Sequence, residues 1–359
     1  MSRVTYILGA GASFGERKRN NEGKITEFTR GLPVVNELER AIQLLQRSEG
    51  TSVFFAAEEA KKRKVTLEQY QYVAHRLYLL QQACTSFPTI DTLAKQLYVT
   101  GDKFFISNGE EIDYARLKHY LTTTLLMLQD EKKRDLRYDG FIASLINSSR
   151  KFPPMTILSW NYDVQFEMAY SGYYTSDRYI PSLWKELNVF NKMYPTEFDY
   201  NSPFAMIKLN GTALFTDSNL DKIDINGKKV NRVTDCFYGG AKETPYQYGY
   251  KYMNSSNYNN LLPYAWEDDN MAMLQKNIGV RTYDTEELIV IGYSFPYVNN
   301  EVDSYILQNM YNLKKVVIQD SNFADIKERI EGILEPVKRS PIIVSKKNLQ
   351  QFYIPNRFV

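Results

Sequence analysis

The chain has 359 residues, of which 43% are hydrophobic, so it can bury the core of one large domain or of two ordinary ones. Its 44 Lys and Arg residues nearly balance its 42 Asp and Glu residues, which argues against nucleic acid or an anionic membrane as the main partner. Two cysteines are too few for a disulfide scaffold or a cysteine-based zinc site. The sequence shows no signal segment and no apolar run of the ~18 residues that cross a bilayer, so we expect a soluble, cytoplasmic protein.

Six short apolar runs predict buried strands, and several of them end in Gly, Asn or Asp. The runs are Val4–Leu8, Met155–Leu158, Phe204–Leu209, Leu288–Ile291, Val316–Ile318 and Ile342–Val344. Their apolar character is continuous rather than alternating, which is typical of parallel strands that are covered on both faces. We therefore expect an α/β fold, with a Rossmann-like parallel sheet, helices on both faces of the sheet and a helical insertion.

The insertion is predicted by helical periodicity between the first and the second run. In "PVVNELERAIQLL" (33–45) the apolar residues fall on one helix face. The stretch "TLEQYQYVAHRLYLLQQA" (66–83) opens with Thr66 and Gln69 at the spacing of a capping box. Periodicity returns in "EIDYARLKHYLTTTLLML" (111–128). We expect residues 34–150 to be a mostly helical insertion within one domain that spans residues 1–359.

Two charged clusters, "EEAKKRKV" (58–65) and "EKKRDLR" (131–137), are interpreted as solvated surface at helix ends or in loops. Residues 216–262 are rich in Asn, Asp, Gly, Ser and Tyr and have few apolar runs, which predicts long loops. Within them, the pair Asn226-Gly227 in "DINGKKV" predicts a short hairpin.

The first predicted strand runs directly into a glycine turn, in "YILGAGASFGE" (6–16). Glycine accepts positive φ and lets a phosphate approach the backbone, whose amides then face the anion. A complete G-x-G-x-x-G motif would have glycine at position 14, whereas this chain has Phe14 there and Gly15 one position later. The turn alone therefore fits either a dinucleotide site or a tight turn without a ligand. If it holds a phosphate, we expect Gly11→Val to weaken binding while the fold survives.

Polar residues follow four more of the predicted strands. The stretches are "TILSWNYD" (156–163), "MIKLNGT" (206–212), "LIVIGYSF" (288–295) and "VVIQDSN" (316–322). Open parallel sheets bind ligands at the carboxyl ends of their strands, although Asn, Asp and Ser are also favoured in ordinary turns. Five such strand ends in one chain favour a ligand site at this edge of the sheet.

In their order and spacing, these motifs resemble the sirtuin-related (SIR2-like) domains, above all the NAD-consuming type found in bacterial anti-phage systems. The family's GAGxS turn matches Gly9–Ser13, its Q-N-I-D stretch matches Trp160–Asp163, its His-Gly pair falls at Asn210-Gly211, and its G-[TS]-S stretch matches Gly292–Ser294. The stretches "GLPVVNEL" (31–38) and "PTIDTLA" (88–94) are also similar to the bacterial subgroup. The resemblance spans nearly the whole chain.

The resemblance implies that NAD+ is the substrate, and it implies a set of site residues. Those implied to bind NAD+ are Gly9, Ala10, Gly11, Ala12, Ser13, Asn161, Asp163, Gly292, Ser294 and Asp320, and those implied to be catalytic are Asn161, Asp163 and Asn210. The backbone amides of the glycine turn and the Ser13 hydroxyl would hold the pyrophosphate. Gly292 and Ser294 would approach the ribose or phosphate side, and Asp320 would accept from an adenosine ribose hydroxyl.

For the nicotinamide half, Asn161 would hold a ribose hydroxyl and orient the attacking water. Asp163 would accept from the nicotinamide amide, as a charged and therefore stronger acceptor. The alternative interpretation is that Asn161 only ends the strand and that Asp163 only caps the helix that begins at "VQFEMAY".

Two departures from the family pattern change the expected chemistry. Deacylating sirtuins carry four zinc-binding cysteines between the third and fourth motifs, whereas this chain has only Cys236 there, so we expect no metal and no protein deacylase. The family's general-base histidine is replaced by Asn210, whose neutral amide cannot take up a proton near pH 7. The two histidines, His75 and His119, lie in helix-patterned stretches and are interpreted as packed or surface residues.

The function implied by the resemblance is NAD+ hydrolysis to nicotinamide and ADP-ribose in anti-phage defence, by a homo-oligomer that a separate sensor subunit activates, with no direct nucleic-acid partner. Loss of a general base typically costs ~10²–10⁴-fold in rate, so Asn210 does not exclude hydrolysis. One alternative is a catalytically degenerate regulatory subunit that binds NAD+ or ADP-ribose. Another is a Rossmann-type oxidoreductase, which an acidic residue closing the second strand would favour, but the chain turns helical there.

Overall fold

The computed structural model describes residues 3–46, 53–106, 109–129, 134–173, 180–194, 198–217, 223–225, 228–230, 244–255, 258–269 and 271–358. A seven-stranded parallel sheet has the order β15-β14-β13-β1-β6-β8-β7. Its strands are β1 (Val4–Leu8), β6 (Met155–Ser159), β7 (Val189–Asn191), β8 (Phe204–Lys208), β13 (Glu287–Ile291), β14 (Lys315–Gln319) and β15 (Ile342–Ser345). The predicted Rossmann-like α/β fold is confirmed. Of the seven strands in this sheet, only the three-residue edge strand β7 was not predicted from an apolar run.

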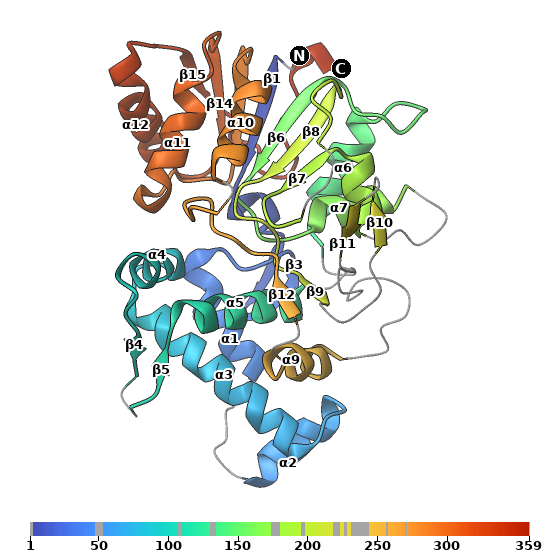
Figure 1. The fold of residues 1–359 in the computed structure, drawn as a ribbon, viewed down its shortest axis with the longest axis vertical. Coiled ribbons are helices and arrows are strands. Elements are labelled where there is room, and N and C mark those ends of the chain that lie inside the picture. Colours follow the sequence, from blue (N-terminus) through green and yellow to red (C-terminus); the bar gives the residue numbers. More distant parts are fainter. Residues whose placement is uncertain are drawn as a thin grey trace.

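Successive residues of the strands enter two separate cores, one on each face of the sheet. Along β1, Tyr6 and Leu8 pack with the helices α6 (Leu136–Leu145) and α7 (Gln165–Ser171), whereas Ile7 packs on the opposite face. That opposite face is covered by α10 (Met271–Thr282), α11 (Asn300–Gln308) and α12 (Phe323–Leu334) (Figure 1). A strand with two buried faces has no polar side, which explains the continuous apolar runs.

A helical lobe lies beyond the end of the sheet that is opposite the chain's N-terminus (Figure 1). Its helices are α1 (Leu38–Gln46), α2 (Val53–Lys62), α3 (Leu67–Ser86), α4 (Ile90–Thr100), α5 (Tyr114–Leu128) and α9 (Pro245–Met253). The predicted capping box is present, because the Thr66 Oγ1 accepts from Gln69 N at 3.1 Å and Gln69 Oε1 accepts from Thr66 N at 3.1 Å. The helical insertion is confirmed, although α6, at its end, packs on the sheet.

The described parts of the segment 216–262 contain more regular structure than the long loops that its composition predicts. It contains α9, and its strand β12 (Tyr258–Asn260) pairs with β9 (Phe215–Asp217). Tyr246 of α9 stacks on Tyr70 of α3, with ring centroids 5.3 Å apart. The sequence signals for α9 are Pro245 at its first position and Gln247, whose side chain accepts from Thr244 N.

Smaller elements complete the described chain. They are the antiparallel pairs β2 (Glu16–Arg19) with β3 (Ile25–Arg30), β4 (Phe104–Phe105) with β5 (Glu111–Ile112), and β10 (Ile223–Ile225) with β11 (Lys228–Val230), together with α8 (Ile180–Glu186). The pair β10–β11 is the predicted hairpin, and its turn, Asn226-Gly227, lies outside the described residues.

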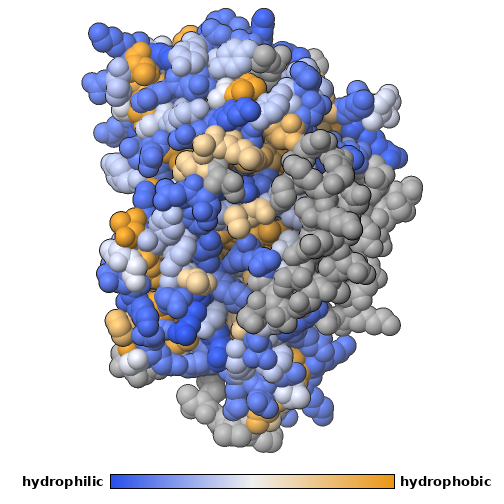
Figure 2. Space-filling model, in the orientation of Figure 1, coloured by the Kyte–Doolittle hydropathy of each residue, from blue (hydrophilic) through white to orange (hydrophobic). Residues whose placement is uncertain are grey.

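The surface that faces the viewer in Figure 2 is mostly hydrophilic over both the sheet region and the helical lobe. Hydrophobic residues lie there in small groups rather than in one broad patch. Among the described residues, no helix combines the length and the apolar character that crossing a bilayer requires. Small exposed apolar groups are ordinary on proteins and do not by themselves mark an interface.

The strand register brings the carboxyl ends of the central strands to one edge of the sheet. Leu8 at the end of β1 pairs with Ser159 on one side and with Ile291 on the other. The chain leaves β1 for β6 on one side and later returns to β13 on the other, so β1 and β13 flank the point where the strand order switches. Open α/β sheets bind their ligands at such a point.

Two glycine turns pack backbone against backbone at this switch point. Gly9 N donates to Ile291 O and Gly11 N donates to Gly292 O, each at 3.0 Å. A Cβ on Gly11 would lie 2.7 Å from Gly292 Cα. The expectation that Gly11→Val leaves the fold intact is therefore wrong, because the substitution would push apart the ends of β1 and β13 whether or not a ligand is present.

Gly292 gives the sharpest test of this contact. It has φ +60°, and a Cβ on it would lie 2.4 Å from Gly11 Cα. We expect Gly292→Ala to lower the free energy of unfolding by about 2–4 kcal/mol, through overpacking and backbone strain. The control is Gly332→Ala in α12, where nothing lies within 4 Å of the added Cβ and helix propensity predicts a gain of about 0.5–1 kcal/mol. Equal denaturation midpoints for Gly292→Ala and the wild type would contradict the packing argument.

Candidate functional site

A cavity of about 1010 Å³ lies at the carboxyl ends of β1, β13 and β14. Five residues that line it are Ala10 and Gly11 of the glycine turn, Gly292 and Ser294 after β13, and Asp320 after β14. All five belong to the residues that the sequence predicts to bind a dinucleotide. The volume matches the upper end of the range for small-molecule sites.

The C-terminal segment forms one wall of the cavity with Leu349, Gln351 and Phe352. Gln319, the last residue of β14, holds this wall in place. Its Nε2 donates to Gln351 O at 2.6 Å, and its Oε1 accepts from Tyr353 N at 2.9 Å. Further lining residues come from α6, which packs against Phe352, and from the residues around the β2–β3 hairpin. The cavity is thus built from parts of the chain that are far apart in the sequence.

The amides of the glycine turn are largely used by the protein itself. Besides Gly9 N and Gly11 N, which donate to the end of β13, Ala12 N donates to Gly9 O at 2.8 Å. Residues Ala10–Ser13 form a short 3-10 helix, and the β2–β3 hairpin follows where a Rossmann turn would start an α-helix. This differs from the prediction that these amides face a pyrophosphate, because the three amides already have backbone acceptors.

Ser13 also differs from its predicted role, because it is buried and is not among the residues that line this cavity. Its hydroxyl hydrogen-bonds with the Tyr138 hydroxyl at 2.9 Å and accepts from Asn161 Nδ2 at 3.0 Å. Asn161 is 5% exposed, and its Oδ1 has no hydrogen-bond partner within the described part of the chain. A buried acceptor without a partner is unfavourable by about 1–3 kcal/mol, so this oxygen can accept a hydrogen bond from a buried water or from a ligand that reaches the layer behind the glycine turn.

Asp163 directly precedes Val164, the N-cap of α7, and its Oδ1 accepts from Gln165 N at 3.0 Å, so its side chain bonds to the first helical amide without being the N-cap itself. Burial raises the pKa of Asp163, and the charge of Lys208 opposes that rise. Lys208 Nζ donates to Asp163 O at 2.6 Å and pairs with Glu167 Oε1 at 3.1 Å, with both charged side chains almost fully buried. This pair anchors the loop of Asn161 and Asp163 to β8 and α7.

Asn210 follows β8 and is 3% exposed. Its Oδ1 accepts from Ala265 N at 2.8 Å, so one of the two lone pairs of this oxygen is already used. Asn161, Asp163 and Asn210 are at the same edge of the sheet as the cavity but are not among its lining residues. The predicted site residues therefore form two layers, one in the cavity wall and one buried behind the glycine turn.

The two histidines lie in the helical lobe, as their helix-patterned stretches predict. His75 of α3 contacts Glu110 at 2.7 Å, and His119 of α5 contacts Tyr252 O at 2.7 Å. Among the described residues, no cluster of three or more His, Cys, Asp or Glu side chains could hold a metal ion.

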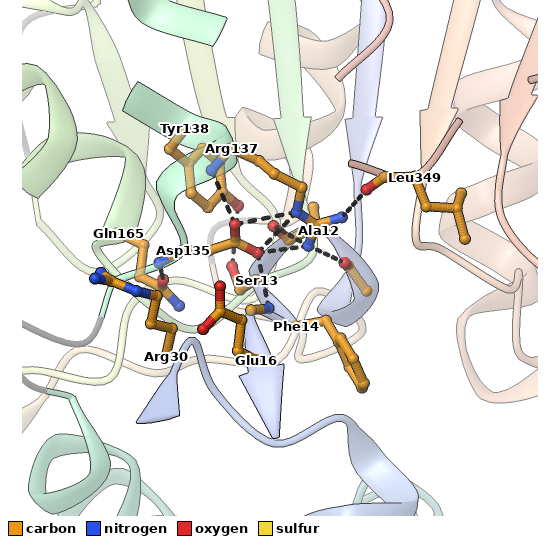
Figure 3. A network of polar contacts seen from close by, with 12 residues as sticks. Ala12, Ser13, Phe14, Glu16, Arg30, Asp135, Arg137, Tyr138, Gln165 and Leu349 are labelled. Atoms are coloured by element: carbon orange, nitrogen blue, oxygen red, sulfur yellow. Dashed lines mark hydrogen bonds and ion pairs between the residues drawn. The ribbon is translucent and has the colours of Figure 1, made fainter. Parts of the chain in front are cut away.

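Two charged residues of the cavity wall, Asp135 and Arg137, were not predicted as site residues from the sequence. The interpretation of "EKKRDLR" as solvated surface is wrong for both, since Asp135 is 2% exposed and Arg137 contacts the glycine turn (Figure 3). The same interpretation fails for Glu59 in the other charged cluster, which is buried and pairs with Arg63. A signal was present, because an Asp directly before an apolar helical stretch is a typical N-cap.

No protein-family model matches the chain, and no curated protein matches it. The fold, the cavity and the side chains around it therefore carry the functional argument.

The middle residue of the Gly-Tyr-Ser stretch supplies a pH-dependent test of this region. Tyr293 stacks on Trp160, with ring centroids 5.3 Å apart, and its hydroxyl donates to Asp303 Oδ2 at 2.8 Å. Burial raises the pKa of Asp303 well above its usual value. The folded protein thus binds the Asp303 proton more tightly than the unfolded chain does, so this contribution to stability is present at low pH and is lost as the pH rises through the folded-state pKa.

We expect the free energy of unfolding of Asp303→Asn to increase relative to that of the wild type as the pH rises from about 4 to about 8. The reason is that the wild type must ionise the buried Asp303 carboxyl over this range, whereas asparagine cannot ionise. The measurement is the difference in the free energy of unfolding between the two proteins at each pH, from chemical denaturation. A difference that stays constant across this range would show that Asp303 does not carry a raised pKa.

Proposed function

We propose that this chain is a sirtuin-related NAD+ hydrolase that converts NAD+ to nicotinamide and ADP-ribose. The observation that carries the proposal is the cavity at the strand-order switch, lined by Gly11, Gly292 and Asp320 and backed by the unpartnered amide oxygen of Asn161. The order of the motifs along the chain supports the same substrate.

The ADP-ribose half of the substrate fits the charged and polar wall of the cavity. Asp320 would accept from an adenosine ribose hydroxyl; its Oδ1 already accepts from Asn322 N at 2.8 Å, which fixes the carboxylate at the end of β14. Two arginines line the cavity, Arg30 and Arg137, beside the carboxylates of Glu16, Asp135 and Asp320, and their N–H groups would bind the phosphate oxygens. Ser294 supplies a further hydroxyl on the β13 side.

For the nicotinamide half, the chemistry needs little from a general base. Cleavage of the nicotinamide–ribose bond develops positive charge on the ribose, and nicotinamide leaves as a neutral group. Asn161 Oδ1 would accept a hydrogen bond from the ribose hydroxyl or from the attacking water, and the buried Asp163 would offer an acceptor to the nicotinamide amide. The low dielectric around Asn161 and Asp163 would strengthen both contacts.

The resemblance extends this proposal to bacterial anti-phage defence, in which a homo-oligomer and a separate sensor subunit would control the loss of NAD+. This role in defence, with its oligomer and its sensor subunit, rests on the motifs alone. Slow turnover would suffice for an enzyme that only has to drain a pool once it is activated.

A second candidate is a regulatory subunit that binds NAD+ or ADP-ribose without cleaving it. The contact between Asn210 Oδ1 and Ala265 N favours it, because the position of the family's general base is occupied by a structural amide. Nicotinamide release separates the two candidates, whereas a change in nicotinamide absorbance without release would indicate an oxidoreductase.

The test is to incubate the purified chain with NAD+, with and without the products of neighbouring genes, and to measure nicotinamide. We expect release by the activated wild type and a decrease of about 10²-fold or more for Asn161→Ala, with a small change in melting temperature. The matched control is Asn191→Ala, which removes another buried asparagine, at the end of β7 and outside the cavity, and should keep the rate per folded molecule. Full activity of Asn161→Ala would overturn this mechanism, and tight ADP-ribose binding without any release would favour the regulatory subunit.

A further inference from the structure

The carboxylate of Asp135 lies directly against the glycine turn, in the wall of the cavity (Figure 3). Its Oδ2 accepts from Gly15 N at 2.8 Å, and its Oδ1 accepts from Arg137 N at 2.9 Å at the start of α6. Asp135 is only 2% exposed, although it belongs to a run of charged residues. An ionised side chain from another part of the chain thus occupies a backbone donor of the turn.

The guanidinium of Arg137 completes this arrangement. Its Nε lies 3.0 Å from both oxygens of Asp135, and its Nη2 donates to Gly11 O at 2.9 Å. Its Nη1 donates to Leu349 O at 3.2 Å, in the C-terminal wall of the cavity. Arg137 therefore bridges the glycine turn, Asp135 and the C-terminal segment, and it is one of the residues that line the cavity.

Gly15 differs from the other donors of the turn in the kind of partner that it has. The amides of Gly9, Gly11 and Ala12 donate to backbone carbonyls. These hydrogen bonds belong to the fold itself, and a ligand does not compete for them. Gly15 N donates to a carboxylate, and a carboxylate and a phosphate use the same donors, namely backbone N–H groups and the fork of an arginine. A backbone amide, an arginine and the N-terminus of a ten-residue helix together favour an anion.

We propose that Asp135 is an internal competitor for the phosphate groups of the ligand. On binding, the diphosphate takes the Arg137 guanidinium and the Gly15 amide, and the Asp135 side chain rotates away from them. Ligand binding is thus an exchange of one anion for another. The protein therefore binds its ligand more weakly than it would if Asp135 carried no charge. The choice of a diphosphate ligand rests on the proposed function, whereas the exchange itself rests on the contacts of Asp135 and Arg137.

The opposite role makes an opposite prediction. If Asp135 only holds Arg137 in position for the ligand, removing its charge would weaken binding. If Asp135 competes, removing its charge frees the donors and eliminates the repulsion between two anions, which strengthens binding. Asp135→Asn separates the two cases, because asparagine keeps an oxygen for the N-cap of α6 and loses the charge.

The experiment measures binding of ADP-ribose to the full chain by calorimetry, with adenosine as the ligand without phosphates. We expect Asp135→Asn to bind ADP-ribose about tenfold or more tightly than the wild type, and Arg137→Gln to bind it about tenfold or more weakly. Adenosine affinity should stay the same in both variants. The matched controls are Asp139→Asn and Arg134→Gln, which break an ion pair next to the same helix start but outside the cavity lining, and should leave ADP-ribose affinity within about twofold of the wild type.

Unchanged or weaker ADP-ribose binding by a folded Asp135→Asn variant would overturn the proposal, as would a complete lack of binding in every variant. Should Asp135→Asn fail to fold, Asp135→Ser tests the same point, since serine also caps a helix and carries no charge. Failure of the proposed function is distinguishable, because it is measured as nicotinamide release. Tighter ADP-ribose binding by Asp135→Asn without nicotinamide release would overturn the proposed hydrolase activity and support the role of Asp135 as a competitor. Nicotinamide release without tighter binding by Asp135→Asn would support the hydrolase activity and overturn the role of Asp135.

Discussion

The close backbone contact between the glycine turn and the Gly292 turn is the constraint on which the rest of the site depends. Two amide-to-carbonyl hydrogen bonds of 3.0 Å join the ends of β1 and β13, and no side chain fits between them. This contact fixes where Ser13 enters the buried layer and where Gly15 meets Asp135. The position of the cavity and of the polar groups around it therefore follows from the absence of three Cβ atoms, at Gly9, Gly11 and Gly292.

The polar groups of the site divide into two environments with different electrostatics. Arg137 and Asp320 are in the cavity wall, where they can meet a charged ligand. Asn161 and Asp163 lie behind the glycine turn, among almost fully buried side chains that include the Lys208–Glu167 pair. In a buried layer of this kind each hydrogen bond is stronger and each unpaired charge is more costly, which explains why burial raises the pKa of Asp163 and why Lys208 opposes the rise.

The strands and the helices of the lobe could be predicted because each leaves a local record in the chain. A strand with two buried faces is a continuous apolar run, and a packed helix repeats its apolar residues every three or four positions. The edge strand β7 and the helix α9 were missed because β7 has three residues and α9, whose sequence is PYQYGYKYM, is rich in tyrosine and has no aliphatic residue except Met253. In the site, the strand-end motifs indicated which residues reach the cavity edge but not which of them are exposed to the cavity.

By itself, the sequence determined the α/β class, the parallel sheet, the helical insertion and the edge of the sheet at which polar residues gather. Only the tertiary structure decided that Asp135 is buried against Gly15, that Asn210 bonds to Ala265, and that Asn161 keeps an unpartnered oxygen. The physical reason is distance along the chain. Apolar periodicity is read within a few residues, whereas Gly15 and Asp135 are 120 positions apart, and the partner of a charged side chain is set by whichever segments the packed core brings together.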